Sequence, residues 1–275
     1  MPTKSKVKNM FDSIAGDYDS LNHILSLDVD KIWRRRALKR IVDAPAPVQV
    51  LDLACGTGDF SIAIAKALSR SHKRVGTPIE AHVKAPAKAP VEAQVTSTGF
   101  VTGDSGRSDL MTKGHVTGVD LSEGMLAVMR EKVQKAGLTE MISIEEGDGE
   151  NLRFPDNTFD RVTIAFGIRN FEDRPKGLRE MLRVLKPGGR LVILELSRPE
   201  NKIIRWFYDL YFLHILPKIG GKVSGDKAAY AYLPASVAAF PGKKEFSATM
   251  REAGFRAVTH KAFTLGICRM YTGEK

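Results

Sequence analysis

The chain contains little cysteine and no long apolar run. The first argues against a disulfide-linked protein and the second against a membrane-spanning one. Among 275 residues there are two cysteines, Cys55 and Cys268, far apart in the sequence. That number argues against a disulfide framework, and without a signal-peptide pattern we expect a reduced, cytoplasmic setting. The most apolar stretch, 203–219, is interrupted by charged residues and a proline, so no segment is predicted to span a membrane.

Metal-ligand spacings are absent from the sequence as well. His72, His82 and His115 are too scattered to form a metal site, and we expect no metal. Cys55 has no histidine or asparagine pattern that would make it a nucleophile, and we interpret it as a packing residue. The composition does provide 43% hydrophobic residues, enough for one large α/β domain over residues 1–275 to bury its core.

The most informative stretch that is present is 50–59, where an apolar run ends in Asp52 and a glycine-rich turn. A helical pattern follows at once, which predicts a strand, a tight loop and a helix N-terminus, an arrangement that holds the polar end of a ligand. Gly56 and Gly58 allow backbone conformations and a close ligand approach that a Cβ atom would block. Asp120 ends a second predicted strand, where a carboxylate can accept hydrogen bonds from both ribose hydroxyls. The sequence therefore predicts a nucleoside ligand.

The type of nucleoside follows from the spacing of the glycines. A dinucleotide fingerprint needs a third glycine, but after Gly56 and Gly58 that position holds Ser61. Asp52 before the loop suits instead a ligand that carries an ammonium group, such as the methionine end of S-adenosylmethionine (SAM). Any strand-to-helix turn can use glycine, so the loop alone does not decide between a SAM site and a structural turn.

Alternating strand and helix patterns continue along the chain. Strands are predicted near 48–53, 115–120, 142–146, 159–166, 189–196, 255–262 and 265–271. Helices are predicted near 5–24, 31–43, 59–68, 123–136, 175–185, 200–215 and 243–253. The alternation implies an α/β fold with a mostly parallel sheet covered on both faces, whose last two strands are antiparallel because few residues join them.

Two further motifs, in their order along the chain, indicate a known class of protein. Residues 159–166 (F-D-R-V-T-I-A-F) read as a buried strand entered by an aspartate, and 185–190 (L-K-P-G-G-R) ends a helix before an apolar strand. With the glycine loop and the acidic strand end, this order resembles the class I SAM-dependent methyltransferases.

Narrower motifs resemble one family within that class. They are F-D-S-I-A-G-D-Y-D at 11–19, A-F-G-I-R-N at 165–170, E-L-S-R-P at 195–199 and Y-A-Y-L at 230–233. They are similar to those of the UbiE/MenG family, the C-methyltransferases of menaquinone and ubiquinone biosynthesis, over about 10–69 and 115–273. The resemblance implies a doubly wound, seven-stranded sheet, a helical cap at 1–45, SAM as the methyl donor and a lipophilic prenylated quinol as the substrate.

The resemblance also implies which residues form the site. For the cofactor these are Asp52, Gly56, Thr57 and Gly58 of the loop, Asp120 at the ribose, and Asp148 with Gly149 near the adenine amino group. A quinol carbon becomes nucleophilic when a neighbouring hydroxyl loses its proton, so the site needs a group that stabilises a phenolate. Arg169 suits charge stabilisation, because a guanidinium is a poor base, and Asn170 suits orientation of the hydroxyl. The alternative for this pair is a strand-end salt bridge and turn.

The proton acceptor is left open by the sequence. Asp19, His23, His214 and water are all candidates.

The positive charge is concentrated near the C-terminus. The chain has a net charge of +10, and residues 197–275 contain eight Lys and five Arg against six Asp or Glu. In this region, around 201–216, basic residues alternate with aromatic ones, a pattern that fits an anionic membrane surface at the inner face of the membrane. A lid helix with a solvated charged face is the simpler interpretation. No RNA-binding motif is present, so we expect no nucleic-acid partner. We leave open whether the chain forms a homodimer.

One segment, 70–114, departs from the family pattern. It is rich in Ala, Pro, Val, Lys, Thr and Ser without hydrophobic periodicity, and we predict a largely disordered insertion. The glycine loop and Asp120 lie outside it. Two other functions remain as alternatives, a SAM-dependent methyltransferase of RNA or protein and a non-catalytic subunit with this fold.

Overall fold

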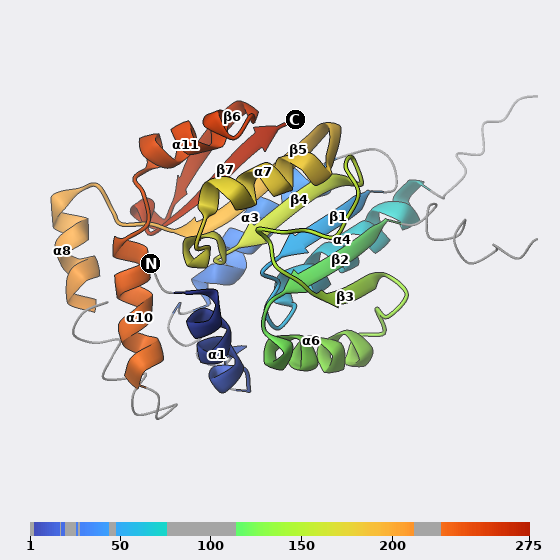
Figure 1. Cartoon of the computed structure of the whole chain (residues 1–275), viewed down its shortest axis with the longest axis horizontal. Helices are drawn as coiled ribbons and strands as arrows, with labels where there is room; N and C mark the ends of the chain where they lie inside the picture. The colour runs from blue at the N-terminus through green and yellow to red at the C-terminus, as the bar shows by residue number, and fades with distance from the viewer. Residues whose placement is uncertain are drawn as a thin grey trace, which may run out of the picture.

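The computed structural model describes residues 3–16, 18–19, 26, 28–43, 48–75, 114–211 and 227–275. Seven strands form one sheet in the order β3-β2-β1-β4-β5-β7-β6, with β3 at one edge and β6 at the other (Figure 1). The strands are β1 (Gln49–Leu53), β2 (His115–Asp120), β3 (Ile142–Glu146), β4 (Phe159–Ala165), β5 (Leu185–Leu196), β6 (Arg256–Phe263) and β7 (Cys268–Glu274). All pair in parallel except β7, which is antiparallel to β5 and β6. The predicted fold class is therefore confirmed.

Helices cover both faces of the sheet. They are α1 (Lys4–Ile14), α3 (Val29–Ile41), α4 (Asp59–Val75), α6 (Glu123–Lys135), α7 (Arg174–Val184), α8 (Lys202–Leu210), α10 (Lys227–Ala238) and α11 (Lys243–Glu252). Two short 3-10 turns, η1 (Ile168–Asn170) and η3 (Thr264–Gly266), follow β4 and β6. Side chains of α3, α4 and α6 pack on one face of the sheet, and those of α7 and α11 pack on the other. Because both faces are covered, the central strands are almost continuously apolar.

The order of the strands determines where a ligand can bind. The chain moves outward from β1 through β2 to β3 and then returns to place β4 on the other side of β1. In open α/β sheets, ligands bind outside the carboxyl ends of the strands at such a switch point. The loops after β1, β2, β3 and β4 all lie at this end of the sheet.

Several predicted boundaries differ from the structure. Strand β5 begins at Leu185 rather than near 189, because Leu185 already pairs with Phe159 before a register shift. The Pro-Gly-Gly sequence therefore lies within the strand, with Gly188 at a φ of +75°. Helix α4 continues to Val75, beyond the predicted end at 68.

Helix α10 was not predicted. Its sequence has no clear hydrophobic periodicity and contains Pro234, which removes one backbone donor from the helix interior. Val237 near its C-terminal end is buried, and just after the helix the buried Phe240 ring lies 4.8 Å from that of Phe246. Tertiary packing therefore stabilises a helix that is rich in alanine but carries a proline in its interior.

Parts of three predictions lie outside the described residues. The predicted helix 5–24 is present as α1 up to Ile14, and 20–25 are not described. The predicted helix 200–215 is present as α8, and 212–226 are not described. Most of the predicted insertion, 76–113, also lies outside the described part of the chain.

Candidate active site

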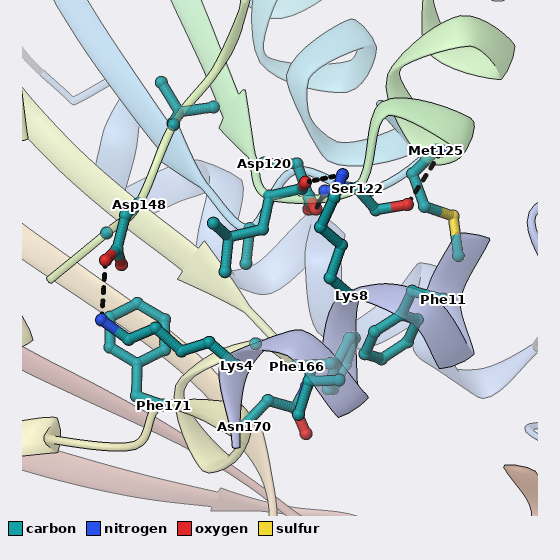
Figure 2. Close-up of a pocket in the computed structure, with 18 of the residues that line it drawn as sticks. Lys4, Lys8, Phe11, Asp120, Ser122, Met125, Asp148, Phe166, Asn170 and Phe171 are labelled. Carbon is teal, nitrogen blue, oxygen red and sulfur yellow. Dashed lines mark hydrogen bonds and ion pairs between the residues drawn. The ribbon is translucent and has the colours of Figure 1, made fainter. Parts of the chain in front are cut away.

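A pocket of about 760 Å³, which includes space open to solvent, lies at the carboxyl ends of four strands (Figure 2). Helix α1 covers it, and the loops after β1, β2, β3 and β4 form its walls. Its lining includes Lys4, Val7, Lys8 and Phe11 of α1, Gly56, Asp120, Leu121, Ser122, Met125, Gly147, Asp148, Gly149, Glu150, Phe166, Gly167, Asn170 and Phe171.

The glycine loop after β1 turns sharply at the pocket. Gly56 and Gly58 have positive φ values of +56° and +82°, which favour glycine. A Cβ atom on Gly58 would also lie 2.4 Å from Cγ of Met129, so the close packing of the loop on α6 requires glycine there. Cys55 is buried beside it, with Sγ 3.5 Å from Sδ of Met129, and burial raises the pKa of its thiol. These contacts agree with a packing role for Cys55.

Asp120 connects the loop after β1 to the loop after β2. Its Oδ2 accepts a hydrogen bond from the backbone N–H of Gly56 at 2.8 Å, and its Oδ1 accepts one from that of Ser122 at 2.9 Å. Burial raises the pKa of Asp120, although these two hydrogen bonds favour the ionised form. Each carboxylate oxygen has a second lone pair, so Asp120 can accept further hydrogen bonds from a ligand in the pocket.

Asp148 occupies the equivalent position after β3. Its Oδ1 accepts from the backbone N–H of Glu150 at 2.9 Å, and its Oδ2 lies 2.6 Å from Nζ of Lys4 (Figure 2). Lys4 also forms an ion pair with Glu150 at 2.8 Å, and although burial opposes the change, both carboxylates raise the pKa of Lys4. The neighbouring Gly149 lies against the ring of Phe171, where a Cβ atom would approach to 2.6 Å. This end of the pocket thus combines a carboxylate acceptor with a flat aromatic surface.

Arg169 lies in η1, directly after β4, and is buried against Glu195 of β5. Its Nη1 is 2.8 Å from Oε1 of Glu195 and also donates to the carbonyl oxygen of Phe166. The backbone N–H of Arg169 donates to Oε2 of Glu195 at 3.0 Å. Burial acts to lower the pKa of Arg169, but the adjacent Glu195 carboxylate raises it, so the guanidinium stays charged. The strand-end salt bridge that was the alternative for Arg169 is therefore present.

Asn170 follows in the same turn and lines the pocket. Its Oδ1 accepts a hydrogen bond of 2.8 Å from the hydroxyl of Tyr232, which comes from α10. Arg174, at the start of α7, is also buried and donates through Nη2 to the carbonyl oxygen of Arg169 at 3.2 Å. Two arginines thus lie close to one buried carboxylate, that of Glu195.

The structure brings together five of the nine predicted site residues. Gly56, Asp120, Asp148, Gly149 and Asn170 all line the pocket. The other four, Asp52, Thr57, Gly58 and Arg169, are not part of its lining.

Asp52, which precedes the glycine loop, and Thr57, which is part of it, are both buried outside the pocket lining. Asp52 is 1% exposed and accepts a hydrogen bond of 2.6 Å from the Ser61 hydroxyl, and burial raises its pKa to about 7. Thr57 donates to Asp19, which also forms an ion pair of 2.6 Å with Lys132.

Among the candidate proton acceptors, Asp19 is therefore engaged by Thr57 and Lys132 and does not line the pocket. His23 and His214 lie outside the described residues.

Several residues at or beside the pocket had no assigned role in the sequence interpretation, among them Lys4, Phe171, Glu195 and Tyr232. Lys4 and Lys8 are spaced i, i+4, which places both on one face of α1, and this spacing was a usable sign. Glu195 and Tyr232 belong to motifs that were recognised, but their partners depend on strand pairing and on α10.

A model of the ubiE/COQ5 methyltransferase family matches residues 2–275. The chain belongs to this family. A ubiquinone/menaquinone biosynthesis C-methyltransferase from Geobacter sulfurreducens is 43% identical over 270 residues, which cover 98% of this chain and 88% of that protein. A demethylmenaquinone methyltransferase from Bacteroides fragilis is 39% identical, covering 98% of this chain and 92% of its own. This ubiE/COQ5 family member is therefore a methyltransferase.

Solved structures support the fold of this methyltransferase. A SAM-dependent methyltransferase from Thermotoga maritima superposes with a TM-score of 0.58 at 16% identity, covering 98% of this chain and 99% of that one. At this identity the likeness concerns the fold alone.

No helix in the described ranges has both the length and the apolar character needed to cross a bilayer. Within the same ranges, no three His, Cys, Asp or Glu side chains are grouped so that they could hold a metal ion.

Proposed function

We propose that the protein transfers a methyl group from SAM to a ring carbon of a prenylated quinol. The observation that carries the proposal is that three strand ends meet at one pocket. Asp120 and Asp148 follow β2 and β3, and the turn that holds Arg169 and Asn170 follows β4. The names of the relatives from Geobacter sulfurreducens and Bacteroides fragilis support a quinone as the substrate class.

The pocket fits SAM by the chemistry of its walls. Asp120 has free lone pairs for the two ribose hydroxyls, and Asp148 has them for the adenine amino group. Gly149 allows the Phe171 ring to pack against the backbone, since a Cβ atom there would approach that ring to 2.6 Å. Both residues line the pocket, where the ring can offer a flat surface to a planar base. When bound, SAM supplies an electrophilic methyl group.

The chain itself must favour the deprotonated form of the quinol. Arg169 and Arg174 carry two positive charges near the single negative charge of Glu195, and all three side chains are buried. A surplus of positive charge in a low-dielectric region stabilises a nearby phenolate, which raises the electron density on the ring carbon. Nε of Arg169 is buried and has no hydrogen-bond partner among the described residues, so it retains donor capacity.

The lipophilic tail of the substrate needs an apolar surface, and α8 offers one. Ile203, Trp206, Phe207 and Leu210 are 71%, 61%, 60% and 40% exposed and lie on one face of the helix at helical spacing. Exposed Lys202 precedes this face. We propose that it receives the isoprenoid tail and rests on an anionic membrane surface, at the end of the molecule where α8 and α10 lie (Figure 1).

Transfer of labelled methyl from SAM in a cell extract tests the class of acceptor. The protein is added to extract of a strain that lacks it, under reducing conditions, and the products are separated into organic-solvent, nucleic-acid and protein fractions. We expect the label in the organic-solvent fraction. Label in the nucleic-acid or protein fraction would support the alternative methyltransferase, and no transfer at all would support a non-catalytic subunit. The variant Arg169→Met serves as the negative control.

A further inference from the structure

Asn170 is held at the pocket by a contact from a distant part of the chain. The Tyr232 hydroxyl donates to Oδ1 of Asn170 at 2.8 Å, although 62 residues separate the two positions. The backbone of Asn170 is also fixed, because its N–H donates to the carbonyl oxygen of Gly167 at 3.0 Å. Both ends of this residue are thus restrained before any ligand binds.

A side-chain amide has two different ends, and in the structure its oxygen faces Tyr232. The oxygen accepts hydrogen bonds, whereas the nitrogen carries two N–H donors. With Oδ1 engaged by the Tyr232 hydroxyl, the NH2 group of Asn170 is turned away from Tyr232. Rotation of the amide by half a turn would require the Tyr232 hydroxyl to change from donor to acceptor.

We infer that Tyr232 is a positioning residue, which orients the Asn170 amide so that it presents N–H donors to a ligand oxygen in the pocket. The inference rests on the proposed function, because it assigns this oxygen to the quinol hydroxyl that loses its proton. Hydrogen bonds to an ionised oxygen are about twice as strong as those to a neutral one. The donors of Asn170 therefore favour the quinolate over the quinol.

Tyr232 is suited to donate across the working pH range. Its side chain is half-buried, and burial raises the pKa of Tyr232, although the Arg169 guanidinium opposes the change. The hydroxyl thus keeps its proton near neutral pH, so Tyr232 acts as a donor to Asn170 and not as the proton acceptor of the reaction.

The packing of α10 explains how Tyr232 keeps its place. One turn further along the helix, Ser236 and Val237 are buried, and Phe240 packs against Phe246 of α11. These contacts fix the axis of α10 beside η1 without involving the pocket. Removal of the Tyr232 hydroxyl alone should therefore leave the helix in position.

Three single variants, one double variant and one control test the inference. Tyr232→Phe removes the donor to Asn170. Asn170→Asp keeps the size and the acceptor for Tyr232 but removes both N–H donors, and Asn170→Ala removes the whole amide. Tyr271→Phe is the matched control, because Tyr271 is buried in β7 with a hydroxyl that has no hydrogen-bond partner among the described residues. Each is assayed for kcat and KM with a reduced demethylmenaquinone, for SAM affinity by calorimetry and for thermal stability.

We expect Tyr232→Phe to lower kcat/KM for the quinol about five- to tenfold, the range for one lost hydrogen bond, with SAM affinity and melting temperature close to those of Tyr271→Phe. Asn170→Asp should be as inactive as Asn170→Ala. Adding Tyr232→Phe to Asn170→Ala should cause no further loss, because the group that Tyr232 orients is already gone. Full activity of Asn170→Asp, or an independent effect of Tyr232→Phe in the double variant, would overturn the inference.

A spectroscopic measurement separates failure of the inference from failure of the proposed function. In protein labelled with ¹⁵N-asparagine, the side-chain NH2 signal of Asn170 is identified by its loss in Asn170→Ala. This signal should shift in Tyr232→Phe and not in Tyr271→Phe, whatever the substrate is. An unchanged signal in Tyr232→Phe contradicts the positioning role, whereas an inactive wild-type protein with a shifted signal contradicts only the assignment of the quinol.

Discussion

Replacement of Asp120 by alanine is the perturbation that bears most directly on the cofactor assignment. The carboxylate accepts backbone hydrogen bonds from Gly56 and Ser122 at 2.8 and 2.9 Å and has further lone pairs toward the pocket. Asp120→Ala removes the proposed acceptors for both ribose hydroxyls. It also leaves the two backbone N–H groups without their partner, but these lie at the pocket wall, where water can replace the carboxylate.

The expected magnitude follows from the exchange of hydrogen bonds with water. Bonds to a charged acceptor contribute more than neutral ones, and we expect SAM binding to weaken by about 1–3 kcal/mol, or roughly 5- to 150-fold. The stability of the fold should change less. Burial raises the pKa of Asp120, so removal of this carboxyl relieves a desolvation cost that partly offsets the lost backbone contacts.

Calorimetric titration with SAM measures the effect, and Asp12→Ala is the matched control. Asp12 accepts hydrogen bonds from the Ser122 hydroxyl and, at 3.1 Å, from the Gly124 backbone, so it supports the same loop without lining the pocket. A second titration uses a dideoxyribose analogue of the cofactor. If Asp120 binds the ribose, the analogue should bind wild-type protein and Asp120→Ala with similar affinity. Wild-type affinity of Asp120→Ala for SAM, or an equal loss in Asp12→Ala, would refute the ribose contact.

Three further predictions concern Asp52, the apolar face of α8 and residues 76–113. Burial raises the pKa of Asp52 from 3.8 to about 7, so the native state binds an extra proton between these values and the free energy of unfolding falls as pH rises through that window. Asp52→Asn should remove this fall, which is at most about 4 kcal/mol over the whole window and at most about 3 kcal/mol above pH 5. Urea unfolding of both proteins at pH 5 and pH 8 measures it, and an equal change of stability in the two proteins would contradict the prediction. Replacing Trp206 and Phe207 together by serine should raise KM about tenfold or more for a long-tailed quinol and much less for a truncated one, whereas equal effects on both would assign the face to another role. Replacing 76–113 by a short Gly-Ser linker should leave folding and SAM affinity nearly unchanged, as judged by thermal unfolding and calorimetry, and loss of either would show that the segment is required.

The fold was largely predictable because its main signals are local. Apolar runs that end in Asp52 and Asp120, followed by helical patterns, indicate parallel strands with crossover helices wherever they occur. The start of β5 was not predictable from such patterns, because a Pro-Gly-Gly sequence is typical of a turn and only pairing of Leu185 with Phe159 extends the strand. Helix α10, with its internal Pro234, likewise depends on contacts with the rest of the molecule.

The candidate site likewise contains residues that were predictable from local sequence and contacts that were not. Gly56, Asp120 and Asp148 follow strands directly, so their meeting at one pocket follows from the parallel sheet itself. The partner of Arg169 was not predictable, since Glu195 lies 26 residues later and reaches it only because β4 and β5 are neighbours. The contact between Lys4 and Asp148 depends on how α1 folds over the sheet, and Tyr232 depends on α10. Contacts between elements distant in the sequence leave no local pattern to interpret.

The most direct test of the central claim is mass spectrometry of the product formed from purified protein, trideuteromethyl-labelled SAM and a reduced demethylmenaquinone. We expect a quinone in which one trideuteromethyl group replaces a ring hydrogen. It should form from the reduced substrate and not from the oxidised one, because only the quinol can become a quinolate. Arg169→Met should form little of it. A methyl group on oxygen, equal reaction of the oxidised quinone, or no labelled quinone at all would contradict the account.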